Sequence, residues 1–260
     1  MRFARAALGP VLVVVAVVAV QSLLHGRVPA AISGLAVVAA ALAVYLFHAR
    51  YVERRDPLEL ATQRLPWFAS GTLLGAGLIA AVILSLAGLG VYRVQGLAPY
   101  PIDLAGAIAL ALSSGVVEEI LFRGYLFRWL SRWSPWAALL VTSAIFGFAH
   151  GHNPHATLFS SVAIALEAGV LLGAAYWLSG NLWFPIGIHA GWNFAEGTIF
   201  STPVSGMQAP GFIAGTLSGP PLLTGGAFGV EASIVAVALC TLAGGAMLAL
   251  CVVRRARPVA

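Results

Sequence analysis

Long apolar runs separated by short polar segments dominate this sequence. A helix that crosses a membrane needs about 20 mostly apolar residues, and runs of that kind recur along most of the chain. Hydrophobic residues make up 60% of the chain and charged residues 9%, whereas a soluble domain has roughly 25% charged residues. A soluble fold of this size could not keep so much apolar surface away from water. The sequence therefore predicts an all-α, polytopic integral membrane protein and excludes soluble globular, disordered, collagen-like and disulfide-scaffold proteins.

Eight spans are expected, at residues 6–24, 30–49, 67–90, 102–121, 135–150, 158–179, 181–200 and 230–252. The fifth is short, and Ser134-Pro135 is a typical helix start for it, with serine as N-cap and proline at the first helical position. The stretch 201–228 is rich in glycine and proline and is expected to form an irregular loop. The chain then divides into three N-terminal spans (1–101), a core of four helices (102–200), and an outer loop with the last span (201–260).

The arginines predict the orientation of these spans. All 14 basic residues are arginines, and the formal net charge is +5. With the N-terminus in the cytoplasm, alternating spans put twelve of them on the cytoplasmic side and only Arg27 and Arg93 outside. Cytoplasmic loops carry such an excess, so we expect both termini in the cytoplasm and no nucleic-acid partner. Arginine-only basicity and short loops point to a prokaryotic plasma membrane. The start lacks a small-residue cleavage site, so we expect a retained span rather than a signal peptide.

Adjacent carboxylates end the fourth expected span. Ionisable groups inside a membrane cost about 2.5–3.5 kcal/mol each and mark sites or water-filled cavities. Glu119 and Arg123 are four residues apart, the spacing of a helical ion pair, while Glu118 is turned about 100° away. One carboxylate beside a cation stays ionised, and its neighbour is free to act as a tunable base. The alternative is a Glu–Arg cluster that reaches the cytoplasmic interface.

Two more spans carry polar residues at helical spacing. Phe146 and His150 share one face at the end of the fifth span, although a lone histidine there is more often structural. His189 and Asn193 share one face of the seventh span, and Glu196 continues that stripe. Such a stripe indicates a surface facing a cavity, or alternatively hydrogen bonds that join helices. Glu167 stands alone in the sixth span, and the sequence does not choose its partner.

These residues suggest hydrolysis if their helices converge. Water held by Glu118 and His150 could attack a carbonyl, and His189 and Asn193 could donate to the developing oxyanion. The sequence has neither GxSxG nor HExxH, so the expected nucleophile is water. Depth is a difficulty, since a span ending near 121 keeps Glu118 close to its cytoplasmic end, while His150 lies about 22 Å along its own span. Convergence then requires the fifth helix to start outside the bilayer or to tilt.

At these residues the sequence resembles the CPBP family, which comprises the CAAX proteases and the bacteriocin-processing (Abi) membrane proteases. Three motifs occur in order: EExxxR at Glu118, Glu119 and Arg123, FxxxH at Phe146 and His150, and HxxxN at His189 and Asn193. The resemblance covers about 105–200. Each motif is weak alone, but three in order on separate helices are a specific signal.

The resemblance implies an intramembrane endopeptidase similar to the type II CAAX prenyl endopeptidases, with residues 102–200 as its catalytic core. It implies Glu118 as general base with His150 on the water, His189 and Asn193 as the oxyanion site, and Glu119 with Arg123 as a supporting pair. The family is called a metalloprotease family, and Glu118, His150 and His189 are the candidate ligands for Zn²⁺; a glutamate-activated water needs no metal. Expected partners are membrane lipid and a membrane-associated protein or peptide, with or without a lipid group.

Two other functions share these features of the sequence. One is a non-catalytic immunity or scaffold protein of the same fold. The other is a small proton-coupled transporter that uses Glu118, Glu119, Glu167 and Glu196 as a relay. The transporter requires a polar path to the outer side, which the nearly apolar last span supports poorly.

Overall fold

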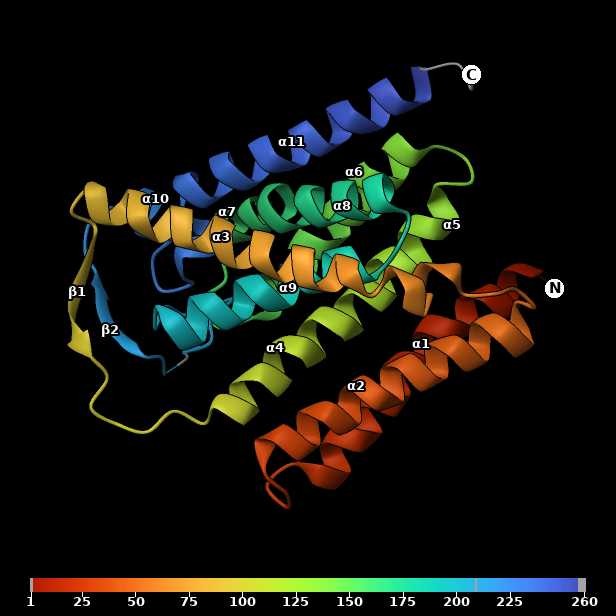
Figure 1. The fold of residues 1–260 in the computed structure, drawn as a ribbon, viewed down its shortest axis with the longest axis horizontal. Helices are drawn as coiled ribbons and strands as arrows, with labels where there is room; N and C mark the ends of the chain where they lie inside the picture. The colour runs from red at the N-terminus through yellow and green to blue at the C-terminus, as the bar shows by residue number, and fades with distance from the viewer. Residues whose placement is uncertain (1, 209, 257–260) are drawn as a thin grey trace.

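The computed structural model describes residues 2–208 and 210–256 as a bundle of helices with one small sheet (Figure 1). The helices are α1 (Arg2–Leu24), α2 (Ala30–Phe47), α3 (Pro66–Gly88), α4 (Leu104–Glu119), α5 (Arg128–Leu130), α6 (Pro135–Ala149), α7 (Leu158–Ile164), α8 (Val170–Ser179), α9 (Trp183–Phe194), α10 (Pro221–Thr224) and α11 (Ile234–Ala256). Four π-helical turns extend or join them, at His48–Val52, Ile120–Phe127, Ala165–Gly169 and Ala195–Ile199.

Six helical stretches in the described part of the chain are long and apolar enough to cross a membrane. They are Ala7–Leu24, Ala30–Val52, Thr62–Gly88, Leu104–Leu130, Leu158–Ser179 and Ile234–Arg254. The helices expected as the fifth and seventh spans are present as well, but α6 has 15 residues and α9 has 12, which is short for a crossing. The all-α membrane fold is therefore supported, while eight crossings and the cytoplasmic orientation stay predictions. The start of α1 and the end of α11 do lie at the same end of the bundle (Figure 1).

The fourth span is longer than expected. The helix does not end near 121 but continues through the π-helical turn Ile120–Phe127 into α5, and so reaches Leu130. Glu118 therefore lies about 18 Å from the end of this helix, counting 1.5 Å per residue. His150 lies about 22 Å beyond Pro135 on α6, whose start is capped by Ser134 as expected. The extension brings both residues to a similar depth, and neither a tilt nor an early start of α6 is needed.

The irregular loop expected at 201–228 contains regular structure, so that prediction was wrong in part. Strand β2 (Ile213–Leu217) pairs antiparallel with β1 (Tyr92–Leu97), with a register shift between Val94 and Gly96. This two-stranded sheet lies at the end of the bundle opposite the start of α1 (Figure 1). The two strands are more than a hundred residues apart in the sequence, so local composition could not reveal their pairing.

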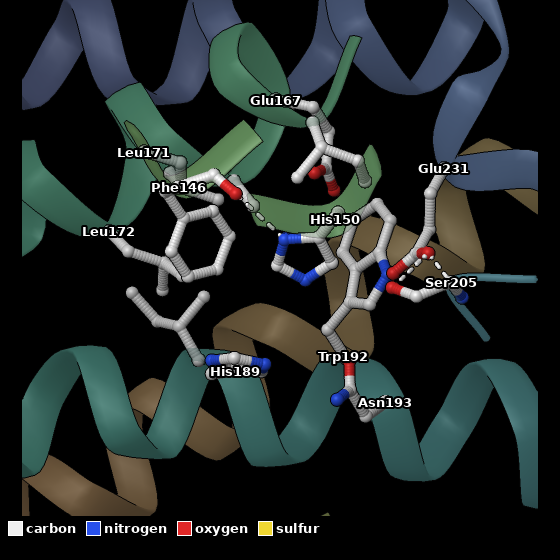
Figure 2. Close-up of a pocket in the computed structure, with 13 residues that line it drawn as sticks. Phe146, His150, Glu167, Leu171, Leu172, His189, Trp192, Asn193, Ser205 and Glu231 are labelled. Carbon is white, nitrogen blue, oxygen red and sulfur yellow. Dashed lines mark hydrogen bonds between the residues drawn. The ribbon is translucent and has the colours of Figure 1, made fainter. Parts of the chain in front are cut away.

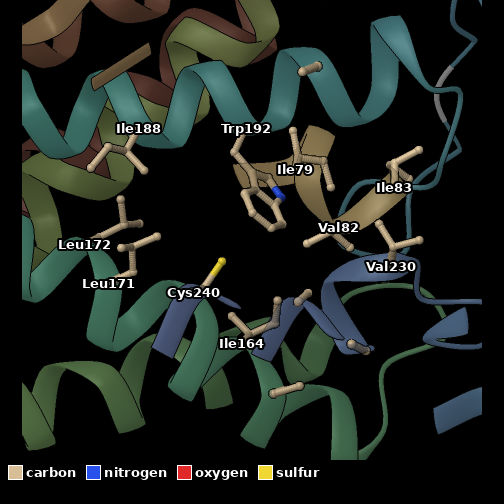
Figure 3. Packing of buried hydrophobic residues seen from close by; sticks show 14 of the residues in the cluster. Ile79, Val82, Ile83, Ile164, Leu171, Leu172, Ile188, Trp192, Val230 and Cys240 are labelled. Carbon is tan, nitrogen blue, oxygen red and sulfur yellow. The ribbon is translucent and has the colours of Figure 1, made fainter. Parts of the chain in front are cut away.

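Two large apolar clusters and a smaller third one hold the described helices together. The larger lies between α3, α7, α8, α9 and α11 and includes Ile79, Leu171, Ile188, Trp192 and Cys240 (Figure 3). The second joins α1 and α2 to α4, which leaves α4 between the two clusters. Cys240 and Cys251 are both buried, and no disulfide joins them. The face of α9 that does not pack on α3 is thereby turned toward α4, and this face carries the polar stripe.

Glycines allow α3 and α9 to pack at close range. Gly71 on α3 meets Gly187 on α9, and a Cβ atom built on Gly75 would lie 2.0 Å from the carbonyl oxygen of Ile188. No side chain fits there, because real Cβ contacts are far longer. Both helices thus carry a GxxxG motif, the pattern by which helices in membranes approach each other closely. This contact fixes the position of α9 and of the polar residues on its other face.

Candidate active site

Glu119 and Arg123 form the ion pair that their spacing predicts. The Arg123 Nη1 atom lies 2.9 Å from Glu119 Oε1, and both side chains are fully buried. The guanidinium also donates to the carbonyl oxygen of Gly169 at 3.0 Å and lies 4.7 Å from the ring centre of Phe146. A buried charge needs such compensation to be tolerated. The interfacial Glu–Arg cluster is therefore not what this structure contains: the pair lies in the interior, between α4, α6 and the turn Ala165–Gly169.

Glu119 also holds a histidine from α9. His189 Nδ1 lies 3.1 Å from Glu119 Oε1, and the His189 side chain is 9% exposed. A carboxylate accepts hydrogen bonds but does not donate them, so Nδ1 carries a proton. Glu119 thus fixes the orientation of the His189 ring, and Nε2 is left for another partner.

Glu118 and His150 face each other across α4 and α6. Glu118 Oε2 lies 3.8 Å from His150 Nε2, which is longer than a hydrogen bond. On the other side of the ring, His150 Nδ1 lies 2.8 Å from the carbonyl oxygen of Phe146. Since that oxygen only accepts, Nδ1 is protonated and, in the neutral ring, Nε2 presents its lone pair toward Glu118. Phe146 packs against the same ring, with 4.7 Å between centres.

Asn193 is half-buried and hydrogen-bonds to a residue that the motifs do not include. Its Nδ2 atom donates to Ser114 Oγ at 3.1 Å. Ser114 precedes Glu118 by one turn of α4, so the bond joins the α4 and α9 sides of the site. An asparagine amide has two N–H groups, and the second one is available to another acceptor. The sequence signal for this contact was the polar pair Ser113-Ser114, which lies one turn before Glu118 in an otherwise apolar span.

A cavity of about 30 Å³, room for one or two water molecules, lies beside these groups (Figure 2). Of the predicted site residues, Phe146, His150, His189 and Asn193 line it. Glu118 does not line it and reaches it only through His150. Three motifs from separate helices thus meet at one place, as the hydrolysis hypothesis required.

Two predicted glutamates have partners that the sequence did not indicate. Glu167 lines the cavity, and its Oε1 atom lies 3.8 Å from the Cys240 thiol. Glu196 does not extend the His189–Asn193 stripe into the cavity, because the helix widens into a π-helical turn at Ala195; instead, it accepts a hydrogen bond from Trp192 Nε1 at 2.9 Å. Glu231, which sequence reasoning missed, lines the cavity too. The sequence signal for Glu231 was its position, since it is an acid at the start of the last expected span.

The candidate zinc ligands do not form a metal-binding set. Among the described residues, no three His, Cys, Asp or Glu side chains are grouped so that they could hold a metal ion. Glu118 and His150 face each other, but the Nδ1 atom of His189 is engaged by Glu119. The arrangement therefore fits two coupled acid–base pairs better than a three-ligand zinc site.

A second network of ion pairs joins α5, at the end of the long fourth helix, to the segment after α2. Glu53 accepts hydrogen bonds from Arg55 Nε at 2.6 Å and from Arg128 Nη2 at 2.7 Å. Glu59 pairs with Arg55 at 2.8 Å and accepts a hydrogen bond from Tyr45. Burial by itself raises the pKa of Glu53, but the hydrogen bonds from Arg128 and Arg55 outweigh it and lower this pKa below its ordinary value. The network holds the segment after α2 against the helix that carries Glu118, Glu119 and Arg123.

Comparison with known proteins agrees with the motifs. Residues 100–195 match the model of a family described as type II CAAX prenyl endopeptidase Rce1-like. No curated protein and no solved structure matches the chain. The matched segment runs from the start of α4 to the end of α9 and contains all three motifs. Over residues 100–195, therefore, the chain is similar to the Rce1-like type II CAAX prenyl endopeptidases, the family that the motifs resemble.

Proposed function

We propose that this protein is an intramembrane endopeptidase that hydrolyses a peptide bond of a membrane-associated protein or peptide. One observation carries the proposal: Glu118 and His150, from two helices, face each other at 3.8 Å beside a cavity that His189 and Asn193 line. The match of residues 100–195 to a protease family supports the same reaction class. The substrate bond would lie beside this cavity, between the water-activating pair and the donors on α9.

Glu118 and His150 would activate the water. The Nδ1–H of His150 is committed to the Phe146 carbonyl, which leaves Nε2 to hold a water molecule that Glu118 also contacts. Glu118 takes a proton from that water as its oxygen attacks the carbonyl carbon. Positioned acid–base catalysis of this kind contributes about 10²–10⁴-fold to the rate. When the tetrahedral intermediate collapses, the C–N bond breaks and the amine takes the proton back from Glu118.

His189 and Asn193 would stabilise the oxyanion. Asn193 has a second N–H group after its bond to Ser114, and His189 donates from Nε2 when both ring nitrogens are protonated. Each such donor is worth roughly 10²–10³ in rate. Glu119 and Arg123 act as positioning residues, since they fix the His189 ring without reaching the cavity. The proposed reaction uses only these side chains, because the described residues do not form a three-ligand metal set. A Zn²⁺ enzyme is the competing proposal.

The membrane supplies the substrate. The site lies among helices long and apolar enough to cross a bilayer, so a peptide anchored by a lipid group or by its own apolar segment is the expected substrate. A prenylated protein is one member of that class, as the family description indicates. A prokaryotic plasma membrane is the expected location.

Cleavage of a defined peptide by the purified protein in liposomes tests the proposal. The probes are an internally quenched, farnesylated peptide ending in Cys-aliphatic-aliphatic-X, its unfarnesylated counterpart, and a degenerate peptide library read by mass spectrometry. We expect cleavage by the wild type, and loss of at least about 10²-fold in Glu118→Gln and His150→Ala. Asp56→Asn is the matched control, since Asp56 is an acid whose side chain is 74% accessible and which does not line the cavity.

Full activity of folded Glu118→Gln would refute the assignment of the base. Absence of cleavage of all three probes by the wild type would favour the non-catalytic immunity or scaffold protein. Proton-coupled flux of a solute into the same liposomes, with no cleavage, would favour the transporter.

A further inference from the structure

Three buried carboxyl groups come from segments that pack around the cavity or next to it. Glu167 comes from the turn between α7 and α8, Glu196 from the turn after α9, and Glu231 from the segment before α11. Their exposed fractions are 2%, 0% and 5%. Glu167 and Glu231 line the same cavity as the catalytic imidazoles, and Figure 2 shows them on either side of His150. The proposed reaction uses none of the three.

These carboxyl groups lack a cationic partner. Within residues 2–208 and 210–256, none of the ion pairs includes Glu167, Glu196 or Glu231. Glu167 Oε2 is buried without a hydrogen-bond partner, and so is Glu196 Oε1. Burying a polar oxygen without a partner is costly, so an unpartnered Glu167 oxygen in a cavity wall indicates that something else binds there.

The other contacts of the cluster are all hydrogen bonds from neutral groups. Ser205 donates to Glu231 Oε2 from its backbone N–H at 2.6 Å and from its hydroxyl at 2.9 Å. Among the described residues, the side-chain partner of Glu167 is the Cys240 thiol, 3.8 Å from its Oε1 atom.

The cavity restricts the kind of cation that fits. The His150 ring is not the cation for these carboxyl groups, because one ring nitrogen faces the Phe146 carbonyl and the other faces Glu118. A metal ion does not fit either, because these carboxyl groups are not gathered into a set of three ligands. With room for one or two waters, the cavity admits an ammonium group, which is about the size of a water molecule, but not a planar guanidinium. An ammonium also has three N–H donors for oxygens that lack partners.

We propose that Glu167, together with Glu231 in the same cavity wall, binds a primary ammonium group of the substrate, carried by a lysine side chain or a free amino terminus close to the scissile bond. This inference rests on the proposed function, because it names the substrate class of the same site. Glu167 and Glu231 would then be specificity-determining residues that select a cationic substrate within an apolar membrane protein.

Binding of a small ammonium ion tests the site without any catalysis. Purified protein in detergent is titrated with n-butylammonium chloride and, in parallel, with n-butanol and with sodium chloride. The readouts are the melting temperature and tryptophan fluorescence, since Trp192 lines the cavity. We expect saturable binding of n-butylammonium alone, weakened at least about tenfold in Glu167→Gln and Glu231→Gln and unchanged in Asp56→Asn. Equal effects of butanol and butylammonium on the wild type, or unaltered affinity in Glu167→Gln, would overturn the proposal.

Cleavage then distinguishes the two sources of the ammonium. Peptide pairs carry lysine or norleucine at positions flanking the scissile bond, or a free or acetylated amino terminus. We expect the cationic member of one pair to be cleaved about tenfold faster or more, and the preference to disappear in Glu167→Gln. Equal cleavage of both members in every pair would refute the role in specificity. Butylammonium binding by a protein that cleaves no peptide would refute the proposed function but uphold the ammonium site.

Discussion

Replacing Arg123 by methionine tests how the buried ion pair supports the site. The change removes the 2.9 Å ion pair with Glu119, the 3.0 Å hydrogen bond to the Gly169 carbonyl and the contact with the Phe146 ring. Glu119 is fully buried, so the change leaves an uncompensated carboxylate in the interior. Removing one partner of a buried pair costs about 3–5 kcal/mol. We expect Arg123→Met to lower the free energy of unfolding by that amount.

The double variant Glu119→Leu with Arg123→Met separates stability from activity. With both charges gone, no uncompensated charge is left in the interior, and replacements of this kind are often neutral or stabilising. We therefore expect the double variant to recover most of the stability lost in Arg123→Met. Activity should not return, because His189 loses the carboxylate that orients its ring at 3.1 Å.

Two measurements decide the outcome. Unfolding by sodium dodecyl sulfate in mixed micelles gives the stability of the wild type, the single variant and the double variant, and peptide cleavage gives their activity. A double variant as unstable as Arg123→Met would show that buried charge does not cause the loss. A double variant that is fully active would show that Glu119 does not position His189.

Four further outcomes are expected. Asn193→Ala should lower kcat by roughly 10²–10³, as loss of an oxyanion donor does, while Ser114→Ala, which removes only an acceptor for Asn193, should lower it less; steady-state kinetics would contradict the role of Asn193 if both variants stayed near wild type. Because hydrogen bonds lower the pKa of Glu53, its stabilising contribution is present above the ordinary glutamate pKa of about 4.3 and is lost as the pH falls through the lowered value; Glu53→Gln should therefore be less stable at pH 7 and vary less with pH in acid, and an equal acid-induced loss in variant and wild type would contradict this. Gly75→Ala should destabilise the protein by about 1–3 kcal/mol, because the added methyl group meets the α9 backbone, and a neutral effect on micelle unfolding would mean that the helices can separate freely. Dialysis against a chelator should leave activity intact if water activation needs no metal; a loss restored by Zn²⁺ would favour the competing zinc enzyme.

The cost of burying polar groups made the site residues predictable. Glu118, Glu119, His150 and His189 stand out because so few ionisable residues interrupt the apolar runs. Helical spacing also predicts the Glu119–Arg123 pair correctly. The same rule would have found Glu231, an acid at the start of the last apolar run, and the GxxxG motifs of α3 and α9 were visible in the sequence as well.

Contacts between distant segments were not predictable in this way. The hydrogen bond between Asn193 and Ser114 depends on how closely α9 approaches α4. The pairing of β1 with β2 depends on a bundle that brings residues 92 and 217 together. Neither leaves a local pattern, because each partner alone looks like an ordinary polar or loop residue. The zinc hypothesis stays a prediction for a related reason: the motifs indicate which residues meet but not that Glu119 engages the Nδ1 atom of His189.

The π-helical turns explain why spacing rules succeed for one glutamate and fail for another. Such turns are rare and occur often at functional sites. Glu119 is the last residue before the turn Ile120–Phe127 and still meets Arg123, whereas Glu196 lies inside the turn Ala195–Ile199 and leaves the stripe that a regular helix would continue. The third turn, Ala165–Gly169, supplies both Glu167 and the carbonyl oxygen that accepts from Arg123. Two of these turns therefore meet through the hydrogen bond from Arg123 to Gly169, and the third directs Glu196 away from the stripe that a regular helix would continue.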